Sequence, residues 1–423
     1  MERLISILQK LSVEHYKINC ETRKSSELFF VRNNLDLSRA NDTTETVLTV
    51  YSDYEKDGRK MRGSSKVFIY PDTSDDKIEE LVSKAKKQAQ YVENPFFELP
   101  GKENCAKKSD KEYNLMDEAV KMAEALFSVD MDERTFINSA EIFAISKTVR
   151  VVNSEGVDVT YTKFGVEGEF VVQSIENDND VELFKQFAYD IPDSEALKKK
   201  CSSALKDVRD RAYAEHCDDL LPDYPVILCD NEVNQLLRFY FQRTDASYIH
   251  PGYSDYRKGN MVSEDIEGEK ISLSLKADRA VDGDGVVLKD TDIIKDGKIV
   301  GIHGNIQYTE YLSEKNVGML ETMVCSNGTL SIEEMKKSPY IMIKSFSDFQ
   351  MDSMDGYFGG EFRLAYIFDG EKERIVTGGT YSGNMFDAQK KLNFSTERYI
   401  DAEYEGPAAV RIGVGATKSG GKE

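Results

Sequence analysis

The sequence predicts an α+β fold, and two observations carry this prediction. Amphipathic helical stripes recur between residues 4 and 216, and hairpin turns containing Asp-Gly recur from residue 57 to residue 370. Helices mixed with antiparallel hairpins, without a regular β–α alternation, are typical of this class. The chain has 423 residues, and at roughly 100–200 residues per domain this length predicts two or three domains.

The N-terminal half is expected to combine amphipathic helices with hairpins. The apolar stripe Leu4, Ile5, Leu8 and Leu11 predicts the first helix. A helix at 72–91 follows a hairpin and is capped by Thr73 or Ser74. The other expected elements are a strand at 27–32, the hairpin 46–54 with 66–70, a linker at 95–101, a helix at 114–127, a meander at 144–152, 157–163 and 169–174, and a long helix at 194–216.

The second half is expected to be rich in strands. Residues 217–225 hold two prolines and no clear period, so we predict an N-terminal α/β domain at 1–217 and a C-terminal β-rich domain at 218–423. The elements expected after this boundary are a strand at 225–229, a helix at 231–242, an acidic turn at 281–285, a hairpin at 293–302, a helix at 331–337, a strand at 340–345, a hairpin at 361–377 and a last strand at 408–414.

The composition excludes several classes of protein. The formal net charge is −21, from 55 Lys and Arg against 76 Asp and Glu, and a field of that sign repels phosphate backbones and anionic lipids. We therefore expect no nucleic acid bound by a broad surface, and no membrane partner. No apolar run approaches the ~20 residues that span a bilayer, and the charged segment 1–11 does not fit a secretory signal. The six cysteines are scattered without metal spacing, which favours a reduced, cytoplasmic chain.

Motifs for nucleotide binding and hydrolase chemistry are missing. The sequence has no G-x-x-x-x-G-K-[ST] loop and no G-x-S-x-G elbow. It contains only four histidines, and no two of them have the helix-turn spacing of a metal site. His216 and Cys217 are adjacent, so on a helix their side chains diverge by about 100° and do not form a dyad. We interpret His250 as a surface-loop residue and His303 as a structural one.

Two loop clusters allow both a structural and a ligand-binding interpretation. Tyr248, Tyr253 and Tyr256 surround His250, and such aromatic residues either cup a ligand or cap a core. The acidic stretch 278–284 lacks the spacing and the glutamate of an EF-hand loop. We interpret that stretch as a solvated turn.

Four segments together resemble one protein family. The segments are residues 150–157, 282–286, 359–362 and 378–384. The first corresponds to an R-x-x-N-S-x-G turn, the second to a D-x-E-G turn with Asp284 in place of the glutamate, and the last to a closing G-N segment. In this order the four segments resemble the TldD/PmbA family, once called modulators of DNA gyrase.

This resemblance implies a fold and an activity. The fold would be an N-terminal α/β domain with an antiparallel sheet and helices, followed by a mainly antiparallel, β-barrel-like C-terminal domain. The activity would be that of a heterodimeric cytosolic metalloprotease acting on peptides or unfolded proteins. In that family one member, TldD, carries H-E-x-x-x-H on a helix after a buried strand, where two histidines bind zinc and the glutamate activates water. The other member, PmbA or TldE, lacks the motif.

The zinc motif is absent from the corresponding positions of this chain. If Leu236 and Leu237 align with the apolar pair before the first histidine, both histidines are replaced, by Arg238 and Arg243, and the glutamate by Phe239. An alternative register places residues 231–232 over the His-Glu pair and retains a glutamate but no ligand. Arginine has no lone pair to offer a metal. The chain therefore resembles the PmbA-like member, with no metal or cofactor of its own and zinc expected only in a TldD-like partner.

The same alignment proposes a remnant cleft in place of the zinc site. Its candidate substrate-binding residues are Arg238 and Arg243, where a guanidinium would pair with a peptide carboxylate, together with Gly383 and Asn384 of the closing G-N segment. The alternative is that the two arginines are solvated helix charges. No catalytic residue is expected in this chain.

The resulting functional prediction is a PmbA/TldE-like, non-catalytic subunit that completes the substrate chamber of a TldD-like protease. The first rival is a stand-alone homodimeric peptide-binding protein without protease activity. The second rival is an enzyme with unrelated chemistry in the remnant cleft. A partner bearing H-E-x-x-x-H distinguishes the first prediction from the homodimer.

Overall fold

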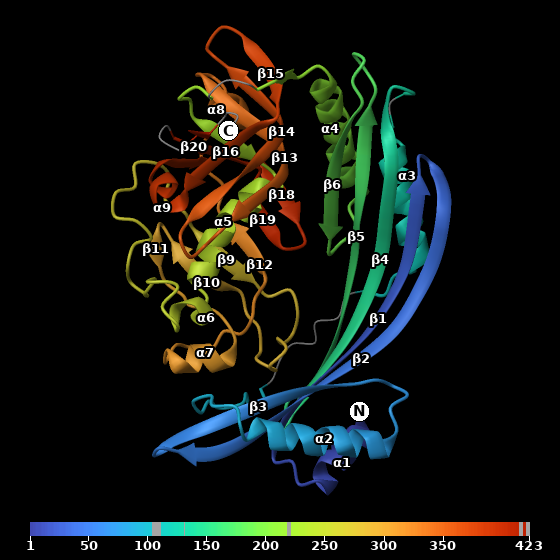
Figure 1. The fold of residues 1–423 in the computed structure, drawn as a ribbon, viewed down its shortest axis with the longest axis vertical. Helices are drawn as coiled ribbons and strands as arrows, with labels where there is room; N and C mark the ends of the chain where they lie inside the picture. The colour runs from blue at the N-terminus through green and yellow to red at the C-terminus, as the bar shows by residue number, and fades with distance from the viewer. Residues whose placement is uncertain (104–110, 131, 218–220, 414–417, 420–423) are drawn as a thin grey trace.

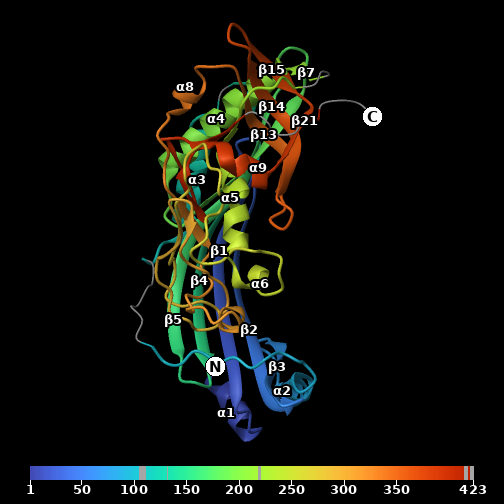
Figure 2. The ribbon, with the colours of Figure 1, turned by 90° about the vertical axis from the view of Figure 1, so that its left-hand side faces the viewer.

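The structure is a computed structural model that describes residues 1–103, 111–130, 132–217, 221–413 and 418–419. Helices and mainly antiparallel sheets are mixed along the chain, so the predicted α+β class is confirmed. Among the described residues, no helix combines the length and the apolar character needed to cross a membrane. The molecule is elongated along the long strands of its N-terminal part (Figures 1 and 2).

The N-terminal part is one curled antiparallel sheet of six strands, ordered β3-β2-β1-β4-β5-β6. Its strands are longer than the sequence predicts, because polar residues with strand propensity continue the pairing beyond each apolar run. The predicted strands 157–163 and 169–174 are parts of one strand, and β6 was not predicted. The strands are β1 (His15–Val31), β2 (Asn34–Lys56), β3 (Arg59–Ile69), β4 (Thr135–Asn153), β5 (Asp158–Ser174) and β6 (Val181–Tyr189).

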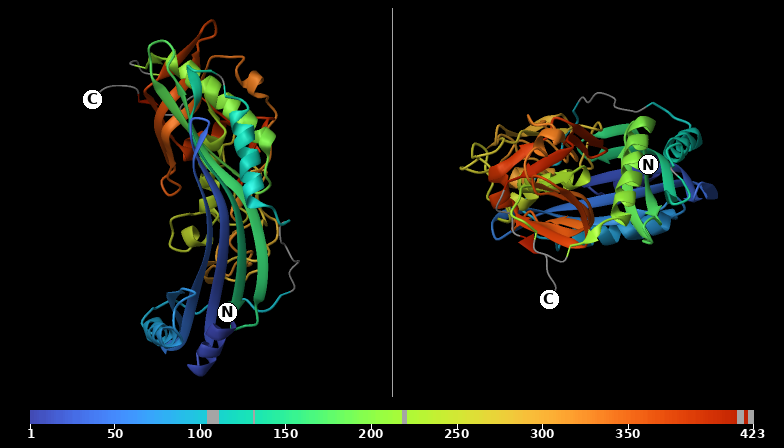
Figure 3. Two further views of the ribbon diagram at one scale, coloured as in Figure 1. Left: turned by 90° about the vertical axis from the view of Figure 1, so that its right-hand side faces the viewer. Right: turned by 90° about the horizontal axis from the view of Figure 1, so that it is seen from above.

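Four helices cover one face of this sheet (Figure 3). Ile18 packs in the core under α1 and α2, and Leu28 packs in the core under α3 and α4. These two residues are an even number of positions apart on β1, so their side chains point to the same face. The helices are α1 (Glu2–Lys10), α2 (Asp75–Ala89), α3 (Leu115–Phe127) and α4 (Ser194–Ala212).

Side-chain caps explain where these helices begin. The side chain of Ser74 accepts a hydrogen bond from the Lys77 N–H, as predicted, and Asn114 and Asp193 cap α3 and α4 in the same way. The helix α4 ends at Ala212, four residues earlier than predicted. The residues after it form a short strand, β7 (Glu215–His216).

The C-terminal part contains two further sheets, and the prediction that it is rich in strands is confirmed. One sheet has the order β11-β10-β9-β12-β19-β18, and the other has β17-β20-β8-β13-β14-β15-β7 with β16 and β21 attached. The strands are β8 (Val226–Cys229), β9 (Leu273–Lys276), β10 (Thr291–Lys295), β11 (Lys298–Ile299), β12 (Thr322–Cys325), β13 (Tyr340–Met351), β14 (Tyr357–Phe368), β15 (Glu373–Thr377), β16 (Gly379–Asn384), β17 (Leu392–Phe394), β18 (Arg398–Asp401), β19 (Tyr404–Pro407), β20 (Ala409–Ile412) and β21 (Lys418–Ser419).

The largest apolar core of the described residues lies between these two sheets and around α5. Leu236, Leu237 and Phe239 of this helix are fully buried in it. The other helices here are short. The helical segments are α5 (Asn231–Arg243), α6 (Ala246–Ile249), α7 (Ile306–Tyr311), α8 (Ile332–Met335), α9 (Met385–Ala388) and the 3-10 turn η1 (Gln389–Lys391).

The predicted domain boundary after residue 217 stays a prediction. The strand β7 lies before it in the chain but pairs with β15 of the C-terminal sheet. Residues 218–220, which follow the predicted boundary, lie outside the described part of the chain. The end of the predicted last strand, residue 414, lies outside it as well.

The acidic stretch 278–284 is not a solvated turn, so that interpretation is wrong. Asp282 is fully buried, and its carboxylate accepts hydrogen bonds from the main-chain N–H groups of Asp284, Val286 and Met319, each at 2.9 Å. Val281 packs against Val151 on the helix-free face of the N-terminal sheet. The turn therefore docks the C-terminal part onto the sheet.

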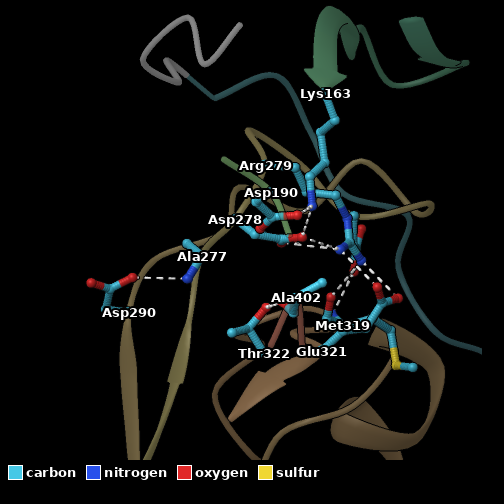
Figure 4. A network of polar contacts seen from close by, with 11 residues as sticks. Lys163, Asp190, Ala277, Asp278, Arg279, Asp290, Met319, Glu321, Thr322 and Ala402 are labelled. Atoms are coloured by element: carbon cyan, nitrogen blue, oxygen red, sulfur yellow. Dashed lines mark hydrogen bonds and ion pairs between the residues drawn. The ribbon is translucent and has the colours of Figure 1, made fainter. Parts of the chain in front are cut away.

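An ionic network reinforces this docking (Figure 4). Lys163 of β5 lies 2.5 Å from the carboxylate of Asp278, which also pairs with Arg279 at 3.1 Å. Arg279 donates two hydrogen bonds of 3.0 Å to Glu321 and one to the carbonyl of Met319. The side chains of Asp278 and Arg279 are only 7% and 11% exposed, so the pairing is shielded from water.

Replacing Asp278 by alanine tests whether this network holds the two parts together. The change leaves Lys163 and Arg279 half-buried with fewer partners, and we expect a loss of about 3 kcal/mol in the free energy of unfolding. The matched control is Glu80→Ala, which removes an exposed i,i+3 partner of Lys77 and should cost below about 0.5 kcal/mol. Urea unfolding of both variants measures the difference, and equal losses would contradict the role of the network.

Candidate functional site

The candidate site is built on a strand, a sharp turn and a helix. All four residues of β8 are buried, because this strand lies between β13 and β20 in the middle of its sheet. Asp230 then turns the chain with φ 54° and ψ −119°, and α5 starts at the next residue. The predicted strand and helix are both present, which places Arg238 in the middle of α5 and Arg243 at its last position.

Arg238 lies at the surface of α5. Its guanidinium forms an ion pair with Glu403 and lies over the ring of Phe241, 5.1 Å from the ring centre. The side chain is 25% exposed. Arg238 therefore joins the helix to the turn between β18 and β19.

Arg243 is buried and enclosed. Its guanidinium forms an ion pair with Asp255 and donates to main-chain carbonyls, the shortest contact being 3.2 Å to Ser353. Three aromatic rings surround it, with centres between 4.8 and 5.4 Å from the guanidinium carbon. Those rings belong to Phe239, Tyr256 and Phe386. Through its two terminal nitrogens the guanidinium holds the loop before Tyr256 against the turn between β13 and β14, while its Nε has no hydrogen-bond partner in the described part of the chain.

Gly383 and Asn384 reach the same turn from the other side. The Asn384 side chain caps α9 by accepting from the Phe386 N–H at 2.9 Å and donates to the carbonyl of Asp355 at 2.8 Å. Gly383 lies opposite Phe358 in the sheet, and a Cβ there would come within 2.6 Å of the Phe358 ring. Glycine is therefore required by the close approach of that ring.

Three of the four predicted site residues thus gather around the turn 352–356, and Arg238 points away from it. In the structure each of the four has a partner within the chain. Their predicted role in substrate binding stays a prediction. The three tyrosines around His250 do not share one role. Tyr256 is a core residue at 6% exposure, while Tyr253 is 55% exposed.

The residues at the zinc-motif positions do not fit a zinc ion. Arg238 and Arg243 offer donors only, and Phe239 is fully buried among aromatic rings. Within the described ranges, no group of three or more His, Cys, Asp or Glu side chains is arranged to hold a metal. Burial also raises the pKa of the Cys325 thiol to about 12, which disfavours the thiolate that a metal needs.

His303 supports the end of α5. It is fully buried, its Nε2 lies 2.9 Å from the carbonyl of Phe241, and its Nδ1 has no hydrogen-bond partner. This arrangement fits a neutral ring that donates through Nε2. Burial lowers the pKa of His303, because a proton on Nδ1 would place an unpaired charge in the core.

A cavity of about 210 Å³ lies between the N-terminal sheet and the C-terminal part. Lys147 and Lys163 line it from the sheet, and Asp278 and Glu321 line it from the opposite side. Glu403, the partner of Arg238, also lines it. Arg238, one of the predicted site residues, is therefore close to a cavity lined by charged side chains.

The sequence did not reveal a second polar cluster at the start of α5. Lys344 lies 3.7 Å from the carboxylate of Asp230, and Asp207 of α4 interacts electrostatically with both. Burial raises the pKa of Asp207 and of Glu232. These residues come from three distant segments, and only the Asp-Asn-Glu sequence directly after a buried strand could have drawn attention to one part of the cluster.

Comparisons with known proteins agree with this architecture. Residues 222–415 match a family model described as the PmbA/TldA metallopeptidase C-terminal domain. The fold is similar to TldE from Thermococcus kodakarensis, with a TM-score of 0.77 and 14% identity over 99% of this chain and 100% of that chain.

Two putative modulators of DNA gyrase have similar folds as well. The protein from Thermotoga maritima has a TM-score of 0.75 and 16% identity over 98% of each chain. The protein from Bacteroides thetaiotaomicron has a TM-score of 0.75 and 13% identity over 98% of this chain and 96% of that chain. At these identities the structural matches establish the fold alone. The search of curated proteins gave no match.

The buried His303 predicts a specific loss of stability in mild acid. The variant His303→Gln keeps a donor for the Phe241 carbonyl and cannot take up a proton. Because the unfolded chain binds a proton near the ordinary pKa of 6.5 and the folded chain does not, stability falls as the pH drops below that value. Wild type should therefore lose more stability than the variant between about pH 7.5 and about pH 5.5, as measured by urea unfolding. Equal losses would show that His303 is not a buried neutral group.

Proposed function

The chain belongs to the TldD/PmbA family, and we propose that it serves there as the PmbA/TldE-like, non-catalytic subunit of a metallopeptidase complex. Its partner is a TldD-like subunit that carries zinc, and the substrates are peptides or unfolded proteins. The complex works in the cytoplasm, where free thiols such as those of Cys201 and Cys229 persist.

One observation carries this proposal, namely the chemistry at the three zinc-motif positions. A catalytic zinc needs three protein ligands of nitrogen, oxygen or sulfur and an open position for water. Here the corresponding positions hold two arginines and a buried phenylalanine. The guanidinium of Arg243 lies between three aromatic rings, and it carries hydrogen-bond donors only.

The geometry of α5 supports the same conclusion. Residues 238 and 243 are five steps apart, and five steps of about 100° place their side chains about 140° apart on a regular helix. Accordingly, Arg238 pairs with Glu403, while Arg243 is buried against Asp255 and Ser353. Two ligands at this spacing meet at one ion only where the helix turn is locally widened or ended, and in this chain the two side chains point to different partners.

In this proposal the subunit encloses part of the substrate chamber, and its partner carries the catalytic site. A peptidase site enclosed by two subunits admits extended peptides and excludes folded proteins, which protects the latter from hydrolysis. The long N-terminal sheet provides such a wall, because its helices cover one face and the docked C-terminal part covers only a portion of the other.

The first test of the proposal is the metal content of the purified chain. We expect well below one zinc per chain after dialysis, because the motif positions offer no ligand. Elemental analysis measures this directly. About one zinc per chain would mean that a metal site exists and would contradict the non-catalytic role.

The second test is reconstitution with a partner that carries H-E-x-x-x-H. The mixture should cleave unstructured peptides, a chelator should abolish the cleavage, and this chain alone should be inactive.

The triple variant Arg238→His, Phe239→Glu, Arg243→His should remain inactive alone. The side chains at positions 238 and 243 point about 140° apart on a regular helix, and a third ligand is missing. It should also be less stable than Arg238→His, since a carboxylate in the core is costly. Chelator-sensitive cleavage by the wild-type chain alone would refute the proposal, and peptide binding without any partner-dependent cleavage would favour a stand-alone homodimer.

A further inference from the structure

Five charged side chains gather where α5 begins, at the junction of the N-terminal and C-terminal parts. The parallel pairing of β8 with β13 aligns Leu228 with Ile343, so Lys344 emerges beside Asp230 with 3.7 Å between the ammonium and the carboxylate. From the other side, Lys185 of the edge strand β6 reaches the carbonyl of Lys344 at 3.5 Å. We call the site formed by Lys185, Asp207, Asp230, Glu232 and Lys344 the elbow crevice.

The turn at Asp230 is held in a conformation that side chains disfavour. Its φ of 54° lies in the left-handed region, and its ψ of −119° is far from the usual left-handed helix value. Its side chain does not cap the helix. Strained turns of this kind concentrate at ligand and active sites. The positive end of the α5 dipole is thereby left facing the crevice.

Asp207 is the observation that points to a missing ligand. The residue is only 5% exposed, and its carboxylate has neither a hydrogen bond nor an ion pair with any described residue. One turn further along α4, Asp210 accepts from the hydroxyl of Tyr366, and Tyr366 lies opposite Met342, two residues before Lys344 on β13. Asp207 is therefore on the side of α4 that faces β13, and its strongest charge interactions are with Lys344 and Lys185. A buried carboxylate without a direct partner is unfavourable unless something binds to it.

Glu232 at the start of α5 is half-buried and also lacks a cationic side chain within ion-pair distance among the described residues. It interacts electrostatically with Lys185 and Lys344, but its only hydrogen-bond donor is its own main-chain N–H. The neighbouring Lys200 is not available to either acid, because its ammonium donates to the carbonyl of Gln186 and to the hydroxyl of Tyr399. Two carboxylates therefore lack a direct cationic partner.

The mixture of charges restricts the class of ligand. A metal ion does not fit, because no set of three acidic, histidine or cysteine side chains in the described chain is arranged around one point, and two lysines lie in the crevice. An anion alone does not fit either, because three carboxylates face two ammonium groups. A ligand that carries an ammonium and a carboxylate on one small molecule satisfies both sets.

We propose that the elbow crevice binds a zwitterion, either a free amino acid or a dipeptide. Its ammonium group pairs with Asp207 and Glu232, and its carboxylate pairs with Lys344 at the start of α5. This site rests on the proposed function for the source of the ligand, since peptide hydrolysis releases molecules of this class. It differs from the remnant cleft, whose residues lie around the middle and end of α5 and the turn 352–356.

Glycylglycine and two small analogues, each lacking one of its charges, test the pairing of both charges. The full-length chain is titrated with glycylglycine, acetylglycine and glycinamide, and binding is followed by ligand-observed NMR. Acetylglycine lacks the ammonium and glycinamide lacks the carboxylate, so each should bind about tenfold more weakly or worse. Equal binding of all three probes, or no binding of glycylglycine, would overturn the proposal.

Substitutions in the crevice locate the binding. Asp207→Asn and Lys344→Met should each weaken glycylglycine about tenfold or more, while Lys206→Met, at an exposed position of α4, should leave it unchanged. If Lys344→Met does not fold, Lys185→Met replaces it. Unchanged affinity in the crevice variants would show that the ligand binds elsewhere.

Thermal unfolding separates a binding role of Asp207 from a structural one. Removing an unpaired buried charge should leave the Tm of Asp207→Asn equal to that of wild type or raise it, although binding is lost. A lowered Tm would mean that the carboxylate stabilises the fold and would contradict the proposal. These measurements use the chain without a protease partner, so their failure leaves the subunit role to the zinc and reconstitution tests.

Discussion

The docking of the C-terminal part onto the N-terminal sheet is the constraint on which the arrangement of the molecule depends. Two turns form this docking contact, and both are held by the same pattern of hydrogen bonds. The Asn153 side chain accepts from the N–H groups two and four residues later, at 2.9 and 3.0 Å, and Asp282 does the same at 2.9 Å. The turns meet where a Cβ on Gly285 would lie 3.0 Å from Val157. The turns at 153–157 and 282–286, two of the segments that resemble the family, thus pack against each other at the interface between the two parts.

Arg243 cross-links the end of α5 to the loops around it. A zinc ion would tie several loops to the helix through its ligands. In this chain the guanidinium of Arg243 ties the loop at Tyr253 and the turn at Ser353 to the helix through hydrogen bonds, and Asp255 balances its charge. The arginine therefore connects three segments through hydrogen bonds and one ion pair.

The joint between the two parts is polar where α4 meets the C-terminal sheet. Asp210 accepts from the hydroxyl of Tyr366 at 2.6 Å, and Lys200 contacts Tyr399 and Asp401 of β18. Interfaces of this composition hold their partners less firmly than apolar cores do. The unfavourable burial of Asp207 is tolerated there, because the apolar cores on either side supply the stability.

The sequence by itself determined the class of the fold, the cap of α2 at Ser74 and the strand before α5, because periodicity and capping act between residues a few positions apart. It also determined that positions 238, 239 and 243 carry no zinc ligand. Only the tertiary structure decided that 278–284 is a buried joint, that Arg243 and Asn384 serve the turn 352–356, and that Asp207 meets Lys344. Those contacts join residues that are distant in the sequence, 29 positions for Asn384 and Asp355 and 110 for Arg243 and Ser353. The sheet registers that bring them together depend on the packing of the whole chain.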